Sequence, residues 1–82
     1  MQEFIVVYVT TGSPAESEQI ARTLVEERLA ACVNRCAPVQ SVYRWQGKVE
    51  ESQEELLIIK SRRELYPALE RRGPELHNDA LP

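Results

Sequence analysis

The hydrophobic pattern changes period at residues 11–14, and this change constrains the fold more than any other feature of the chain. Residues 3–10 are β-branched and aromatic and are apolar on both faces, which predicts a strand that is central in its sheet. Residues 11–14, Thr-Gly-Ser-Pro, end the strand. Ser13 is predicted as a helix N-cap, with proline at the first helical position and glutamate at the third, which is a capping box. We therefore expect an amphipathic helix over residues 14–29.

The middle of the chain predicts a long hairpin. Residues 31–36 are expected to form a strand, which Pro38 interrupts as a bulge or bend. Residues 41–60 are expected to form a hairpin with a polar tip and a buried base, and the turn signal lies at residues 46–48.

A second helix is expected over residues 63–72, and Gly73-Pro74 should end or kink it. The order strand, helix, strand, strand, helix predicts an α+β fold, the ferredoxin-like split βαβ pattern. Two helices would cover one face of an antiparallel sheet, and the open face is a candidate for association. One further strand would complete this pattern, so we expect the last strand to be truncated.

Length and charge narrow the functions that the chain can have. We expect 82 residues to form a single domain, residues 1–82, with a core thin enough to need a metal or a partner chain. A net charge of −3 argues against nucleic-acid binding. The sequence has no apolar run of the roughly 20 residues that cross a bilayer, and no secretory signal opens it. We therefore expect no membrane partner and a cytoplasmic location.

No catalytic or cofactor-binding residue is predicted. His77 is the only histidine, and no orienting acid for a serine nucleophile is evident. The turn at residues 11–13 lacks the glycines and the lysine of a phosphate-binding loop. Acidic residues occur in pairs at residues 50–51 and 54–55. The two members of each pair are adjacent on a strand and point to opposite faces, so they cannot flank one glycosidic bond.

Cys32 and Cys36 are expected to be free thiols. On one extended strand they would lie ~13 Å apart, whereas a disulfide needs Cα atoms within about 7 Å. We favour Cys32 as a small buried hydrophobic residue. The alternative is a metal site in which Cys32 and His77 bind copper or zinc. One chain supplies too few ligands to complete such a site. This alternative therefore includes a site that is shared between subunits.

Tyr43 and Trp45 alternate with Val42 and Arg44, so the two aromatic residues are expected on one face of the hairpin. In so small a domain a tryptophan is either core or an interface anchor. We favour the interface, because aromatic residues are enriched in interface cores and hot spots.

Two blocks of the sequence resemble the divalent-cation tolerance protein CutA family. They are residues 26–34, Glu-Glu-Arg-Leu-Ala-Ala-Cys-Val-Asn, and residues 41–50, Ser-Val-Tyr-Arg-Trp-Gln-Gly-Lys-Val-Glu. The resemblance extends over residues 3–72 without a gap. It implies a ferredoxin-like subunit and a homotrimer in which strands of neighbouring subunits pair edge to edge and the hairpin takes part. It also implies copper or other divalent-metal binding and tolerance in the cytoplasm, without an established enzymatic activity.

The sequence also departs from this family. Val9 stands where some members have a metal-binding cysteine at the end of the first strand. His77 matches a histidine near the end of the second helix, and Cys32 matches a cysteine of the family motif. After His77 the family continues with Pro-Tyr, a strand and a helix, where this sequence has only residues 78–82. The alternative function is a small regulatory trimer that binds an anion or a small molecule at the subunit clefts.

Overall fold

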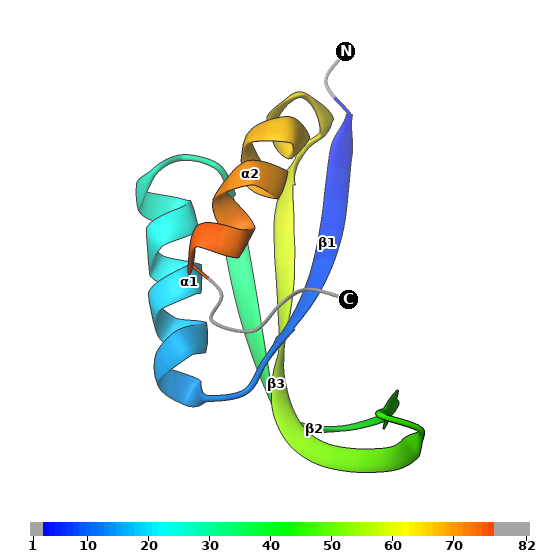
Figure 1. Ribbon diagram of the computed structural model, residues 1–82. Coiled ribbons are helices and arrows are strands. Elements are labelled where there is room, and N and C mark those ends of the chain that lie inside the picture. Colours follow the sequence, from blue (N-terminus) through cyan, green and yellow to red (C-terminus); the bar gives the residue numbers. More distant parts are fainter. Residues whose placement is uncertain (1–2, 77–82) are drawn as a thin grey trace.

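Two helices lie on one face of a three-stranded antiparallel sheet in the computed structural model, which describes residues 3–76 (Figure 1). The strands are β1 (Phe4–Thr11), β2 (Cys32–Trp45) and β3 (Lys48–Arg62), and the helices are α1 (Pro14–Glu26) and α2 (Tyr66–Leu76). A short 3₁₀ turn, Arg63–Leu65, precedes α2. The predicted α+β fold, with an antiparallel sheet, two helices on one face and a long hairpin, is confirmed.

β1 lies at an edge of the sheet that residues 3–76 form, and within these residues the prediction that it is central is wrong. The strand order is β1-β3-β2, so β3 is the central strand. The apolar residues that suggested burial on both faces of β1 are Phe4, Val6 and Tyr8, which are 80%, 50% and 67% exposed. Apolar character on the second face of this strand therefore marks a surface that residues 3–76 do not cover.

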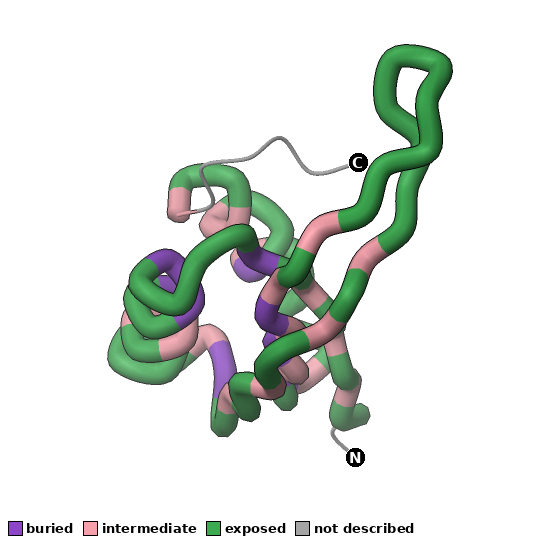
Figure 2. Tube along the Cα trace, turned by 90° about the horizontal axis from the view of Figure 1, so that it is seen from below, coloured by how far each residue is buried: buried purple, intermediate pink, exposed green. Residues whose placement is uncertain are grey.

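The core lies between the helices and the odd-numbered positions of β3. Leu57, at 0% exposure, and Ile59 contribute from the sheet. Ile20 and Leu24 contribute from α1, and Leu69 from α2. Figure 2 shows how few segments are buried, since most of the chain is exposed or intermediate. A short chain buries a smaller share of its surface than a long one, and the small core agrees with this expectation.

The beginning of α1 agrees with the sequence. Ser13 has extended backbone geometry, and its hydroxyl accepts a hydrogen bond from the Glu16 amide at 3.2 Å. Beneath this cap, the buried hydroxyl groups of Thr11 and Ser17 are hydrogen-bonded to each other. The Ser13 hydroxyl therefore satisfies one backbone amide in the first turn of the helix, as the Ser-x-x-Glu pattern predicts.

α1 ends at Glu26, earlier than the sequence predicts, because the chain turns sharply at Arg28. Arg28 adopts a left-handed conformation with φ of 62°. The Arg28 amide bonds to the Val25 carbonyl at 3.0 Å, and the Leu29 amide bonds to the Leu24 carbonyl at 2.9 Å. This pair of bonds is the Schellman motif, in which glycine usually holds the left-handed position.

We expect the substitution Arg28→Gly to stabilise the fold. A side chain in the left-handed region costs about 1–2 kcal/mol, while glycine adds entropy to the unfolded chain. The net gain should be about 0.5–1 kcal/mol, measured as a higher urea midpoint at unchanged slope. Arg28→Ala is the control, because it also removes the charge but keeps the Cβ atom. Equal stabilisation by both variants would assign the effect to charge.

The hairpin of β2 and β3 is longer than predicted. β2 runs without a break from Cys32 to Trp45, and the predicted irregularity at Pro38 is a register shift between Cys36 and Val39. Gln46 and Gly47 form the turn with φ of 51° and 79°, as the centre of a type I′ hairpin requires. The far half of the hairpin projects from the body of the molecule, whose longest extent is 45 Å (Figures 1 and 2).

α2 begins at Tyr66 and continues through Gly73 and Pro74 to Leu76. Of the two expected outcomes at Gly73-Pro74, an end or a kink of the helix, the end is wrong. Proline removes one backbone donor, but only the last residues of the helix follow it. Arg72 spans the proline through an ion pair with Glu75 at 3.6 Å. It also binds Glu27, at the end of α1, through two hydrogen bonds of 2.9 and 2.8 Å. These contacts fix the last turn of α2 against α1.

The Arg72–Glu27 pair predicts a pH-dependent contribution to stability. The hydrogen bond from Arg72 lowers the pKa of Glu27 below its ordinary value of 4.5. The pair therefore stabilises the fold above about pH 4.5, and this contribution is lost as the pH falls through the lower, folded-state pKa. We expect Glu27→Gln to lower the urea midpoint at pH 7 and to have less effect at pH 3.5. Glu26→Gln is the matched control, and an identical pH profile for both variants would contradict the assignment.

Candidate functional site

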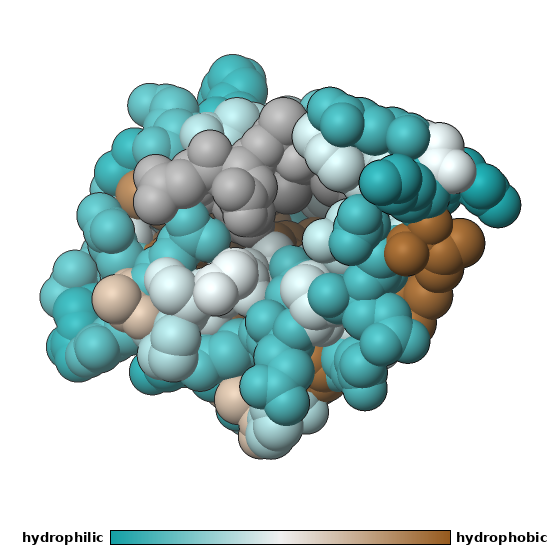
Figure 3. Space-filling view, turned by 60° about the horizontal axis from the view of Figure 1, so that its bottom comes forward, coloured by the Kyte–Doolittle hydropathy of each residue, from teal (hydrophilic) through white to brown (hydrophobic). Residues whose placement is uncertain are grey.

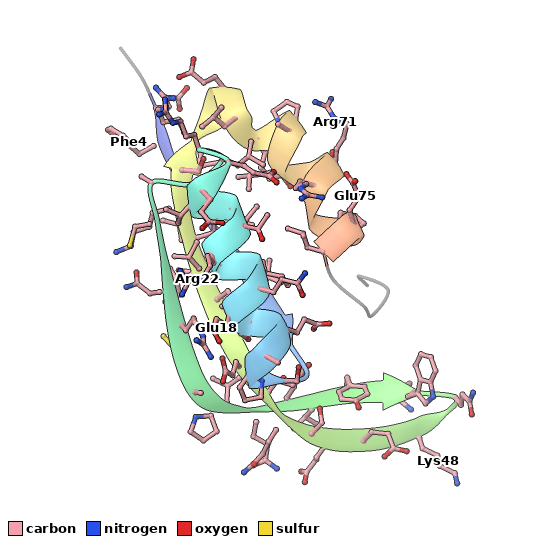
Figure 4. All side chains as sticks on the ribbon, turned by 90° about the vertical axis from the view of Figure 1, so that its left-hand side faces the viewer. Phe4, Glu18, Arg22, Lys48, Arg71 and Glu75 are labelled. Carbon is pink, nitrogen blue, oxygen red and sulfur yellow. The ribbon has the colours of Figure 1, made fainter. Side chains whose placement is uncertain are left out.

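The sheet face opposite the helices, here called the open sheet face, carries the most exposed apolar side chains among residues 3–76. Directly opposed residues of antiparallel strands share a face, so the register places the even-numbered residues of β1 with those of β3. The members on the three strands are Phe4, Val6, Tyr8, Leu56, Ile58, Cys32, Asn34 and Cys36. In Figure 4, Phe4 points away from the helices. In Figure 3, apolar surface gathers on one side of the molecule, and most of the other visible surface is hydrophilic.

The register shift in β2 carries Tyr43 and Trp45 onto this same side of the strand pair. Cys36 is opposite Leu56 before the shift, and after it Tyr43 is opposite Glu50 and Trp45 is opposite Lys48. The extra residue in β2 moves its odd-numbered positions to the side that the even-numbered ones occupied. Tyr43 is 44% and Trp45 is 61% exposed. The prediction that they share a face is confirmed, while their role in an interface stays a prediction.

Cys32 lies on the open sheet face and is exposed, so its interpretation as a small buried hydrophobic residue is wrong. The helices cover the opposite face of β2, which leaves this position open. The Cys32 Sγ atom lies 3.9 Å from the Asn34 side-chain oxygen, to which it donates a weak hydrogen bond. Cys36 is half-buried, and both thiols are free, as the sequence predicts.

The structure brings no set of metal ligands together within residues 3–76, where no group of three His, Cys, Asp or Glu side chains could hold an ion. Val9, at the position of the missing family cysteine, lies half-buried on the helix side of β1. His77 lies outside the described residues. Cys32 is therefore the only predicted ligand that the structure places.

A shallow groove of about 340 Å³ lies between α1 and β2. Ala21, Val25 and Val33 give it apolar walls, and the charged residues Glu18, Glu26, Arg22 and Arg35 surround these walls. Arg22 pairs with Glu18 at 3.6 Å, and the two side chains lie close together on the side of α1 next to β2 in Figure 4. Arg35 pairs with the buried Glu55 at 3.2 Å. The charges compensate each other, so the groove has no electrostatic preference for an anion.

Sequence analysis missed the contribution of β1 to the exposed apolar surface. Its signal was present, because Phe4, Val6 and Tyr8 alternate with Ile5 and Val7 in an apolar run without charge. Such a run is typical of a strand that is buried on both faces. It does not indicate whether the residues that bury each face belong to the same chain.

Comparison with known proteins gives the family. The family model described as CutA1 divalent ion tolerance protein matches residues 5–82. The chain belongs to the CutA1 family. A relative from Thermus thermophilus, "Divalent-cation tolerance protein CutA", is 47% identical over 77 residues, which are 94% of this chain and 75% of the relative. "Protein CutA, chloroplastic" from Arabidopsis thaliana is 49% identical over 65 residues, 79% of this chain and 36% of the relative.

Solved CutA1 structures have the same fold. The crystal structure of CutA from Xylella fastidiosa matches with a TM-score of 0.94 and 40% identity, covering 98% of this chain and 77% of that one. The description of the family and the name of the Thermus relative refer to tolerance of divalent cations. The chain spans about three quarters of the Thermus relative and about a third of the plant one. Within residues 3–76, none of the helices has the length and apolarity of a membrane span.

Proposed function

We propose that this chain is a cytoplasmic divalent-cation tolerance protein that binds copper or another divalent cation, assembles as a homotrimer and catalyses no reaction. Membership of the CutA1 family and the names of the relatives support the role in divalent-cation tolerance. The observation that carries the proposal on this chain itself is the open sheet face, which combines exposed aromatic residues with the exposed thiol of Cys32.

The open sheet face and the hairpin support assembly. Monomeric proteins seldom leave adjoining large apolar side chains in water, and surfaces of this kind usually bind a partner. Phe4 and Tyr8 are more exposed than the helix-facing residues of β1, although they are larger than any of them. Tyr43 and Trp45 extend the same side of the sheet along the hairpin. We propose that these four residues lie at contacts between three chains.

The proposed metal site is incomplete within one subunit. A thiolate and an imidazole suit copper or zinc, but Cys32 alone cannot hold an ion. We propose that Cys32 and His77 are ligands and that a neighbouring subunit completes the site. The exposure of Cys32 on the face proposed for assembly supports this arrangement, because the thiol is accessible to a second chain.

We expect copper binding to weaken at least about tenfold in Cys32→Ser and in His77→Ala, since even lost outer-shell partners cost 10–100-fold in metal affinity. Binding to the wild type should also weaken as the pH falls through roughly 6.5, because protonated imidazole binds no metal. Calorimetric titration of the assembled protein with Cu(II) measures both effects.

Cys36→Ser is the matched control for this titration. Cys36 is a second thiol on the same face, but it is half-buried and not a proposed ligand, so its loss should leave the affinity unchanged. Phosphate and nucleotide titrations in parallel test the regulatory alternative. Equal copper affinity in wild type, Cys32→Ser and His77→Ala, together with saturable nucleotide binding, would replace the proposal by that alternative.

A further inference from the structure

The far half of the hairpin, residues 42–51, projects from the body of the molecule (Figures 1 and 2). All of these residues are exposed, and the two strands pair with each other as far as Trp45 and Lys48. A two-stranded hairpin has little stability of its own. The direction in which this half projects must therefore be set at its base, where the hairpin leaves the sheet.

The base of the hairpin contains the bulge in β2. The register shifts between Cys36 and Val39, so residues 37 and 38 of β2 lie opposite the single residue Glu55 of β3. Such a bulge interrupts the hydrogen bonds between the strands and bends the strand that carries it. In Figure 4, both strands turn out of the sheet beside the first turn of α1. The bulge is therefore the point about which the hairpin can pivot.

A charged contact lies at this bulge, on the helix side of the sheet. The Arg35 Nε and Nη2 atoms donate to Glu55 Oε1 at 3.3 and 3.2 Å. The same Nη2 atom donates to the Pro14 carbonyl, in the first turn of α1, at 3.2 Å. The side chain of Glu55 is only 11% exposed, and that of Arg35 is 38% exposed. These contacts of Arg35, here called the brace, connect β2, β3 and α1 where the hairpin begins.

The Glu55 end of the brace rests on a well-packed part of the subunit. Glu55 is buried and lies opposite Thr11 of β1, which is fully buried. The Thr11 hydroxyl is hydrogen-bonded to that of Ser17 in α1, which is fully buried as well. Next along β3 on the same face is Leu57, a residue of the core. The brace therefore attaches the base of the hairpin to a fixed position on the body of the molecule.

We propose that the brace fixes the direction of the hairpin and contributes little to the stability of the subunit. The cost of removing two charges from water offsets most of their attraction, so a buried ion pair adds little net stability. Its hydrogen bonds, however, are directional and hold three elements in one arrangement. The inference rests on the proposed trimer only for its purpose. A hairpin that already points in the right direction loses less conformational freedom when it binds a neighbouring chain.

Two sets of variants separate direction from stability. Arg35→Met combined with Glu55→Met removes both charges, so no buried carboxylate loses its partner, and such replacements are often neutral or stabilising. Arg35→Lys keeps the charge but lacks the planar group that reaches both Glu55 and Pro14. The matched control is Arg22→Met combined with Glu18→Met. It makes the same substitutions in an exposed ion pair of 3.6 Å on α1, away from the bulge.

Energy transfer between two dyes measures the direction of the hairpin. The dyes are attached at Lys48→Cys near the hairpin tip and at Glu70→Cys on the exposed side of α2, in a background of Cys32→Ser and Cys36→Ser. Time-resolved transfer at nanomolar concentration, where fluorescence correlation gives the size of one chain, yields the distribution of distances. We expect this distribution to be roughly twice as wide in both brace variants, because a two-stranded ribbon pivots at an unsupported bulge. The control should match the wild type, and circular dichroism and urea midpoints confirm that all variants fold.

A distribution as narrow as that of the wild type in either brace variant would overturn the inference, and so would equal widening in the control. The proposed trimer is tested separately, by light scattering of unlabelled chains over a dilution series. We expect the double methionine variant of the brace to associate about tenfold more weakly than the control, because a mobile hairpin must be ordered on binding. A wild type with the mass of one chain at every concentration would refute the trimer, while the distance distributions would still decide the inference about the brace.

Discussion

Leu57→Ala should destabilise the fold more than any other single truncation in the sheet. Leu57 is fully buried at the centre of β3, between the two helices and both neighbouring strands. Replacing such a leucine by alanine costs about 3–4 kcal/mol, because the lost transfer free energy adds to that of the remaining cavity. A small domain has only about 5–15 kcal/mol of stability in total. Urea unfolding at low protein concentration, where assembly contributes little, measures the loss.

Leu56→Ala is the internal control for this prediction. The same residue type one position earlier lies half-buried on the open sheet face, opposite Thr10 and Cys36. We expect its truncation to cost about 1 kcal/mol in the unfolding of the separate subunit, since less apolar area leaves water. A cost equal to that of Leu57→Ala would mean that the open face is also core within the subunit.

Local chemistry explains which features of the fold were predictable from sequence. Ser13 caps α1 through its own side chain, and Gln46-Gly47 turns the hairpin through its own backbone. Pro38 marks the irregularity in β2 because it cannot donate a ladder hydrogen bond. Each of these signals acts within a few residues, so the sequence alone locates it.

The incorrect predictions about β1 and Cys32 concern interactions between distant segments, whereas the one about the end of α1 is local. The apolarity of residues 4–11 is local, but whether β1 is central or at an edge depends on which strand lies beside it. Cys32 is exposed because both helices cover the other face of β2, which the short run around the cysteine cannot indicate. Arg28 holds a left-handed position where the motif favours glycine, so the end of α1 had no sequence signal.

The candidate site was also predictable from the sequence only in part. Alternation along β2 predicts that Tyr43 and Trp45 share a face, and the register confirms it. That this face continues onto Phe4 and Tyr8 follows only from the strand order and from the extra residue in β2. A surface spread over three strands is a property of the sheet, so a search along the chain finds only its hairpin part.

Trp45→Ala should weaken assembly more than it weakens the subunit. Trp45 is 61% exposed near the tip of the projecting hairpin, where it contributes little to the core of its own chain. If the hairpin takes part in the proposed trimer, truncating a buried interface tryptophan costs about 2–4 kcal/mol, which corresponds to a roughly 30- to 1,000-fold weaker association. Light scattering over a dilution series should give a trimer for the wild type at micromolar concentration and dissociation of the variant.

Val42→Ala separates this effect from a general disturbance of the hairpin. Val42 is 62% exposed and lies on the opposite side of the strand pair, opposite Glu51. Its truncation removes apolar surface from the same hairpin without touching the side that continues the open sheet face, so the trimer should persist. Equal weakening by both variants would place the contact on the hairpin as a whole. Full retention of the trimer in Trp45→Ala, with an unchanged melting temperature, would show that Trp45 lies outside the interface and that the β1 part of the open sheet face carries the assembly.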